Sequence, residues 1–111
     1  MKEKFEKSNE IKRKALSLIP HQTGTFSRRV ESFVEGVFPT YVQTANGSHF
    51  TDIDGNEYLD YLCGLGPITL GYNYKPVNDA IVEQLKQGIL FSLPHPVEVE
   101  CSEKISQVIP N

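Results

Sequence analysis

The polar residues best suited to bind a substrate are Arg28 and Arg29, which follow the hydroxyl-rich stretch TGTFS at residues 23–27. A guanidinium presents its N–H donors in a fixed planar fork, which suits a carboxylate or a phosphate group. The other interpretation, favoured by the spacing alone, is a solvent-facing pair that closes a surface loop. Both interpretations place these arginines on a loop.

A second candidate is the glycine-rich segment CGLGPITLG at residues 63–71. Its glycines do not have the G-x-G-x-x-G spacing of a dinucleotide site, and Pro67 would disturb the helix start that such a site needs. The segment contains no G-x-x-x-x-G-K-[ST] phosphate loop either. The glycines allow positive φ angles and a close approach of backbone to a neighbour or ligand, which is compatible with lining an active site.

The other chemically capable residues form no catalytic or metal-binding pattern. The D-x-D-G sequence that begins at Asp52 fails as an EF-hand loop, because Glu57 and Cys63 occupy the positions that need Gly and Glu. Glu57 and Asp60 are three apart on a predicted strand, so their side chains point to opposite faces and make no acid/base pair. His95, between two prolines, has a functional interpretation, but a structural role is favoured.

The elements that must position these residues follow from apolar periodicity and turn signals. Asn46-Gly47 and Asp54-Gly55 are predicted as two-residue hairpin turns, which indicates an antiparallel meander of three strands. Helix ends are predicted from proline and glycine. The expected order makes an α+β segment. It is a helix at 5–19, strands at 41–44, 49–53 and 57–62, a helix that starts near Pro76 and is ended by Gly88, and a helix that starts near Pro96 and is stopped by Pro110.

Composition narrows the class of protein. The 111 residues suffice for one domain at most, and 11 basic against 14 acidic side chains give a net charge of -3. A nucleic-acid-binding domain is usually basic, so nucleic acid is not an expected partner. No apolar run is long enough for a membrane span, and the charged N-terminus is unlike a signal peptide. We expect a reduced, cytoplasmic protein in which Cys63 and Cys101 are small buried hydrophobic residues.

Four motifs occur in an order that resembles the N-terminal segment of class III pyridoxal-phosphate-dependent aminotransferases. They are LIP followed by TGTFSRR, then GSHFTDIDGNEYLDYL, then GLGPITLGYNYKPVNDAI, and finally FSLPHPVEVECSEKISQVIP. Each motif alone is weak, whereas all four in order are fairly specific and cover the chain from about residue 8 onward. Within that family the sequence is most similar to the glutamate-1-semialdehyde aminomutase group and its aminotransferase relatives.

The resemblance implies a fold-type-I transferase that works as a homodimer and holds pyridoxal 5'-phosphate on a lysine as a Schiff base. In such enzymes the cofactor carries the chemistry and the protein orients the substrate. The phosphate loop, the ring-nitrogen acid and the Schiff-base lysine map beyond Asn111, so we assign no catalytic residue. We therefore expect residues 1–111 to be the N-terminal segment of a class III domain, without its large cofactor-binding domain and inactive alone.

The resemblance also assigns binding roles to particular residues. Those expected to form the substrate-side wall are Ser27, Arg28, Leu65, Gly66 and Pro67. Those expected to lie in a loop near the dimer interface are Phe91, Ser92 and Leu93. The sequence departs from the aminomutase pattern at three places, namely Leu65 in place of an aromatic residue, Tyr74-Lys75 in place of His-Pro, and His21 in place of glycine. These departures favour a related aminotransferase over the aminomutase.

A different class of function stays open on the residues alone. The chain could be a self-standing small α+β module that serves for binding or dimerisation without catalysis. Such a module would unfold cooperatively and have a defined oligomeric state. An enzyme fragment would instead expose apolar helix faces, because its three strands cover only part of them.

Overall fold

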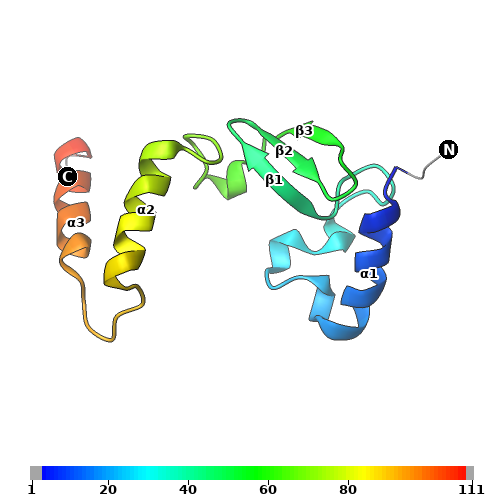
Figure 1. Cartoon of the computed structure of the whole chain (residues 1–111), viewed down its shortest axis with the longest axis horizontal. Coiled ribbons are helices and arrows are strands. Elements are labelled where there is room, and N and C mark those ends of the chain that lie inside the picture. Colours follow the sequence, from blue (N-terminus) through cyan, green and yellow to red (C-terminus); the bar gives the residue numbers. More distant parts are fainter. Residues whose placement is uncertain (1–3, 110–111) are drawn as a thin grey trace. The chain divides into compact units, whose positions relative to one another are not determined.

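The computed structural model describes residues 4–109, and the chain divides into two compact units, with the boundary in the sequence between Tyr74 and Lys75. The elements are α1 (Glu6–Leu18), β1 (Val42–Asn46), β2 (His49–Asp52), β3 (Glu57–Leu59), α2 (Lys75–Gln87) and α3 (Pro96–Val108). The first unit contains α1 and the strands β1 to β3, together with short 3-10 helices, and the second unit contains α2 and α3 (Figure 1). The predicted α+β order of helix, meander and two helices is confirmed.

The three strands form an antiparallel sheet in the order β1-β2-β3. The first hairpin turn lies one residue later than predicted, because Asn46 pairs with His49 and so belongs to the ladder. The second turn has three residues instead of two, since the Asp52 amide donates to the Asn56 carbonyl at 2.9 Å. Gly55 then takes the left-handed position of that turn, with a φ of 89°.

The β2–β3 turn also connects the sheet to α1. The residue before α1, Phe5, provides no side-chain cap. Instead the Asp54 carboxylate accepts hydrogen bonds from the amides of Lys7 (2.7 Å) and Ser8 (3.0 Å) and from the Ser8 hydroxyl (2.5 Å). The first amides of a helix have no partner within the helix, so Asp54 supplies a cap from about 46 residues away. Asn56 adds a hydrogen bond to the Lys4 carbonyl at 3.1 Å.

The core of the first unit is small and partly polar. Phe5 and Ala15 of the α1 region are its buried apolar side chains among the described residues. Asp52, with 0% exposure, accepts from the amides of Asp54 and Asn56, from the Asn56 side chain and from the Tyr58 hydroxyl. A buried carboxylate is tolerated only when its oxygens are satisfied. Asp52 is therefore a structural residue that shapes the turn carrying Asp54.

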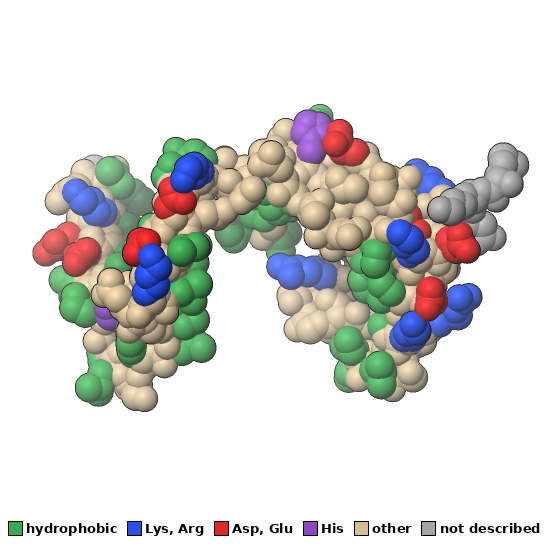
Figure 2. Space-filling model, in the orientation of Figure 1, with side chains coloured by type: hydrophobic (Ala, Val, Ile, Leu, Met, Phe, Trp, Pro, Cys, Tyr) green, Lys and Arg blue, Asp and Glu red, His purple; other side chains and the backbone are tan. Residues whose placement is uncertain are grey.

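In the second unit, neither helix has a buried residue in the described part of the chain. Figure 2 shows hydrophobic side chains gathered along α2. His95 caps α3, because its Nδ1 accepts from the Val97 amide at 3.2 Å while its own amide donates to Glu98 at 2.8 Å. His95 thus has a structural role, as the N-cap residue of α3. Pro110, expected to end this helix, lies outside the described residues.

The expectation that both cysteines are buried hydrophobic residues was wrong. Cys101 is exposed, and Cys63 in the first unit is half-buried, so the two thiols are not core residues here. The apolar stripe of α3, to which Cys101 belongs, is exposed at its other residues as well, namely Val97, Ile105 and Val108. No helix in the described range is long and apolar enough to cross a membrane.

Candidate functional site

The glycine-rich loop, defined here as residues 60–72, is hydrogen-bonded to the β1–β2 turn at both of its ends. At one end the Asp60 amide donates to the Ser48 carbonyl at 2.8 Å. At the other, Tyr72 and Gly47 exchange two backbone hydrogen bonds of 2.7 and 2.9 Å. Gly71 is required by this close approach, since a Cβ there would lie 2.9 Å from the Gly47 carbonyl oxygen. The loop therefore projects from a fixed base.

The side chains of Asp60 and Tyr72 join the two ends of the loop directly. Asp60 Oδ2 accepts from the Tyr72 hydroxyl at 2.7 Å. Its Oδ1 accepts from the amides of Leu62 at 2.8 Å and Cys63 at 3.3 Å. These bonds also explain why β3 ends at Leu59 instead of continuing to Leu62 as predicted. The backbone turns at Asp60 because its carboxylate accepts from the amides two and three residues later.

The electrostatics of this pair follow from its hydrogen bonds. The bond from Tyr72 holds the pKa of Asp60 below its usual value, against the opposing effect of burial, and the two amides act in the same direction. Burial raises the pKa of Tyr72, as do the bond to Asp60 and the charge of that carboxylate. The Arg28 charge opposes this rise in the pKa of Tyr72. At neutral pH the pair is therefore a phenol donating to a carboxylate.

Between these ends the loop contains a left-handed turn. The φ angles of Cys63, Gly64 and Leu65 are 47°, 60° and 65°, and that of Gly66 is 111°. For a residue with a side chain this conformation costs roughly 1–2 kcal/mol, so Cys63 and Leu65 are strained. Such strain persists only where surrounding contacts impose it, and it is concentrated at functional sites. Leu65 is 75% exposed at the tip of this turn.

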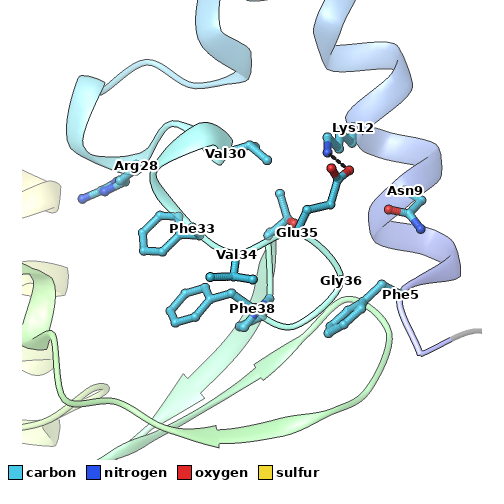
Figure 3. Close-up of a pocket in the computed structure, with 12 residues that line it drawn as sticks. Phe5, Asn9, Lys12, Arg28, Val30, Phe33, Val34, Glu35, Gly36 and Phe38 are labelled. Carbon is cyan, nitrogen blue, oxygen red and sulfur yellow. Dashed lines mark hydrogen bonds and ion pairs between the residues drawn. The ribbon is translucent and has the colours of Figure 1, made fainter.

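The two adjacent arginines have different environments. The Arg29 guanidinium lies 3.9 Å above the Phe26 ring, and its Nε donates to the Ser32 hydroxyl at 3.1 Å. Arg29 is thus part of the local packing of the loop. Ser27 and Arg28 are exposed in the short 3-10 helix Phe26–Arg28, and Figure 3 shows the Arg28 side chain directed away from Lys12 and Glu35. Its charge acts instead on Tyr72 of the glycine-rich loop.

A crevice between α1 and residues 28–40 is too small for a substrate. Figure 3 shows its lining, which includes the Lys12–Glu35 ion pair and the stacked rings of Phe33 and Phe38. Its volume is about 40 Å³, far below the roughly 300–1,000 Å³ of ligand pockets. It has room for ordered water only. We therefore regard this crevice as a packing feature of the first unit.

The described lysines do not fit a role as the cofactor's covalent partner. A lysine that forms a Schiff base is activated by desolvation or by a neighbouring cation. Every described lysine is instead exposed or only half-buried, and four of them form ion pairs with carboxylates. The pairs are Lys12–Glu35, Lys14–Glu10, Lys75–Asp79 and Lys86–Glu83. The described residues also contain no cluster of three or more metal-ligating side chains.

Comparison with known proteins identifies the family. The profile described as Aminotransferase class-III matches residues 32–111. The chain belongs to the class III aminotransferase family. It is 37% identical over 107 residues to the glutamate-1-semialdehyde 2,1-aminomutase of Methanosarcina acetivorans, covering 96% of this chain and 24% of that protein. It is 34% identical to the 3-aminobutyryl-CoA aminotransferase of Cloacimonas acidaminovorans, with 96% and 26% coverage.

Solved structures agree with this assignment. A transaminase with PLP bound matches with a TM-score of 0.77 and 28% identity, over 92% of this chain and 23% of that one. A glutamate-1-semialdehyde-aminomutase from Pseudomonas aeruginosa PAO1 matches in fold with a TM-score of 0.76 and 22% identity, over 91% and 22%. The chain thus has the fold of a transaminase segment and spans about a quarter of the length of the curated relatives it matches.

Sequence reasoning found the two loops but missed the pair that joins them. Asp60 was considered only as an acid/base partner of Glu57, and Tyr72 was not singled out. A signal was present, since an aspartate at a strand end that precedes a turn favours capping of the following amides. The predicted roles of the wall residues and of the loop containing Phe91, which lies in the second unit, stay predictions.

Proposed function

We propose that this chain is the N-terminal segment of a pyridoxal-phosphate-dependent aminotransferase or aminomutase. The reaction would move an amino group between an amino acid, or an amino ketone or aldehyde, and a carbonyl acceptor. The observation that carries the proposal is the class III family match over residues 32–111, joined to similarity with curated aminomutases along 96% of the chain. Pyridoxal phosphate, when bound, supplies the electron sink for such chemistry.

In this proposal the segment contributes the substrate-side wall. Arg28 is exposed, and no hydrogen bond or ion pair holds its guanidinium within the described range. It is therefore available to bind a substrate carboxylate, with Ser27 as a neighbouring hydroxyl donor. Leu65, Gly66 and Pro67 would line the same wall from the glycine-rich loop, in which Leu65 and Gly66 have positive φ angles. The residues that hold the cofactor itself would come from the remaining length typical of the relatives.

We also propose that the complete enzyme is a cytoplasmic homodimer in which Phe91, Ser92 and Leu93 lie near the interface. Support comes from their exposure, at 49% for Phe91 and 79% for Leu93, on the segment between two helices that bury no described residue. A surface with many large exposed apolar side chains usually packs against another part of the protein or another subunit. By the same reasoning the isolated chain would be inactive and prone to association.

Two measurements test the proposal. The first is to read the gene past the Asn111 codon for a frame that encodes a phosphate-binding loop and a further lysine. The second is to compare the 111-residue chain with the complete frame, each supplied with pyridoxal phosphate, in an assay of amino-group transfer. We expect turnover and cofactor absorbance bound to protein only for the complete frame. A stop followed by unrelated sequence, with no turnover from any form, would refute the assignment.

The same samples test the alternative, a small α+β binding or dimerisation module. Cooperative unfolding of the 111-residue chain together with one defined oligomeric state would support that alternative. The network around Asp52 and Asp54 is the feature that favours it, since it gives the first unit tertiary contacts of its own. The uncovered helices of the second unit argue against it.

A further inference from the structure

The side-chain bond between Asp60 and Tyr72 is placed to control the glycine-rich loop. It joins residues 12 apart at the two ends of the loop, and its length is 2.7 Å. The backbone bonds to the β1–β2 turn fix the same two points. The strained residues Cys63 and Leu65 lie between them. Strained backbone persists only where surrounding contacts hold it in place. Among the hydrogen bonds that join the two ends of the loop, the Asp60–Tyr72 bond has an ionised acceptor.

The bond is partly covered by the protein. Asp60 and Tyr72 are both half-buried, whereas Tyr61, the next residue after Asp60, is 86% exposed. A hydrogen bond from a neutral donor to a carboxylate is stronger than one between neutral groups, and more so where water is partly excluded. Tyr72 also lies within the electrostatic reach of Arg28. The charge of Arg28 thus acts electrostatically on one partner of this bond.

We propose that Asp60 and Tyr72 are positioning residues that hold Leu65, Gly66 and Pro67 in place within the glycine-rich loop. The effect of the pair on catalysis rests on the proposed function, whereas its effect on the conformation of the loop does not. Neither residue needs to touch the substrate. Their effect is to keep the turn at Cys63–Leu65 in its left-handed conformation and thereby to fix the shape of the wall.

The structural part is tested by amide hydrogen exchange on the protein as expressed. The reporter amides are those of Leu65, Gly66 and Ile68, each bonded within the loop at 2.9–3.0 Å. Tyr72→Phe removes the hydroxyl and keeps the ring, and we expect these amides to exchange roughly tenfold faster, equivalent to about 1.4 kcal/mol. The matched control is Tyr61→Phe. The β1–β2 ladder amides should keep their protection in both variants.

A double variant separates a shared bond from two independent effects. If Asp60 and Tyr72 act through one interaction, Asp60→Asn combined with Tyr72→Phe will speed loop exchange less than the product of the two single effects. Independent structural roles would multiply instead and would overturn the proposal. Equal exchange in Tyr72→Phe and wild type, or an unprotected loop in the wild type, would overturn it as well.

The functional part is tested in the complete enzyme by steady-state kinetics. For Tyr72→Phe we expect a several-fold higher KM for the amino substrate, with kcat changed by less than about twofold, because binding geometry is altered and the reacting groups are not. An unchanged KM with faster loop exchange would overturn the positioning role and leave the proposed function intact. Absence of activity in the wild-type enzyme would refute the proposed function and leave the exchange result valid.

Discussion

Replacing Asp54 by alanine should weaken the docking of α1 on the β2–β3 turn. The carboxylate accepts three hydrogen bonds from the start of the helix, at 2.7, 3.0 and 2.5 Å. Loss of a helix N-cap costs about 0.5–2 kcal/mol, and loss of a hydrogen bond to a charged group about 1.5–3 kcal/mol. These costs overlap, because they describe the same contacts. We therefore expect Asp54→Ala to lower the free energy of α1 docking by about 2 kcal/mol.

The assay is amide hydrogen exchange of residues inside α1, such as Ile11 and Lys12, whose protection requires the docked helix. A loss of 2 kcal/mol corresponds to roughly thirtyfold faster exchange. Asp54→Asn keeps an acceptor oxygen and should lose about half as much free energy, since asparagine is also a good N-cap. The matched control is Asp79→Ala, which removes an exposed pair with Lys75 worth less than about 0.5 kcal/mol.

The dependence on pH gives a second test of Asp54. Burial by itself would raise the pKa of Asp54, but the hydrogen bonds from the Ser8 hydroxyl and from the Lys7 and Ser8 amides together hold it below its ordinary value of 3.8. The stabilisation from a lowered pKa is complete above the unfolded pKa and is lost as pH falls through the folded one. Protection of α1 should therefore be constant near neutrality and fall below about pH 4. If the amides of α1 exchange as slowly in Asp54→Ala as in the wild type, Asp54 does not cap the helix.

Three further predictions concern other parts of the chain. In the complete enzyme, Arg28→Ala should raise KM for an acidic substrate about tenfold or more, with Arg28→Lys intermediate because it keeps the charge without the fork, as steady-state kinetics will measure. Gly71→Ala should lower the free energy of unfolding by about 1–2 kcal/mol in denaturant titration, because its φ is 82° and its Cβ would meet the Gly47 backbone. His95→Ala should cost α3 about 1 kcal/mol, visible as faster exchange in that helix, and leave the meander unchanged.

The elements themselves were predictable because their signals are local. Apolar spacing and the positions of Pro76, Gly88 and Pro96 gave the helices to within a few residues of α1, α2 and α3. β-branched and aromatic residues between turn signals gave the meander. The turns themselves differed in detail, since Asn46 belongs to the ladder and the second turn has three residues. Strand register is set by the hydrophobic pattern of the strands together with the geometry of the turn, so the turn residues alone do not fix where the turn lies.

Only the tertiary structure determined which residues far apart in the chain are in contact. The sequence alone identified an anion-suited arginine pair, a glycine-rich loop and a family resemblance. It did not show that Arg29 packs on Phe26 while Arg28 stays available, or that Asp54 caps a helix that begins 48 residues earlier. Periodicity and turn rules describe neighbours within a few residues. A carboxylate accepts hydrogen bonds from distant residues only after folding has placed their unpaired amides and hydroxyls near it. Which donors these are depends on the three-dimensional fold.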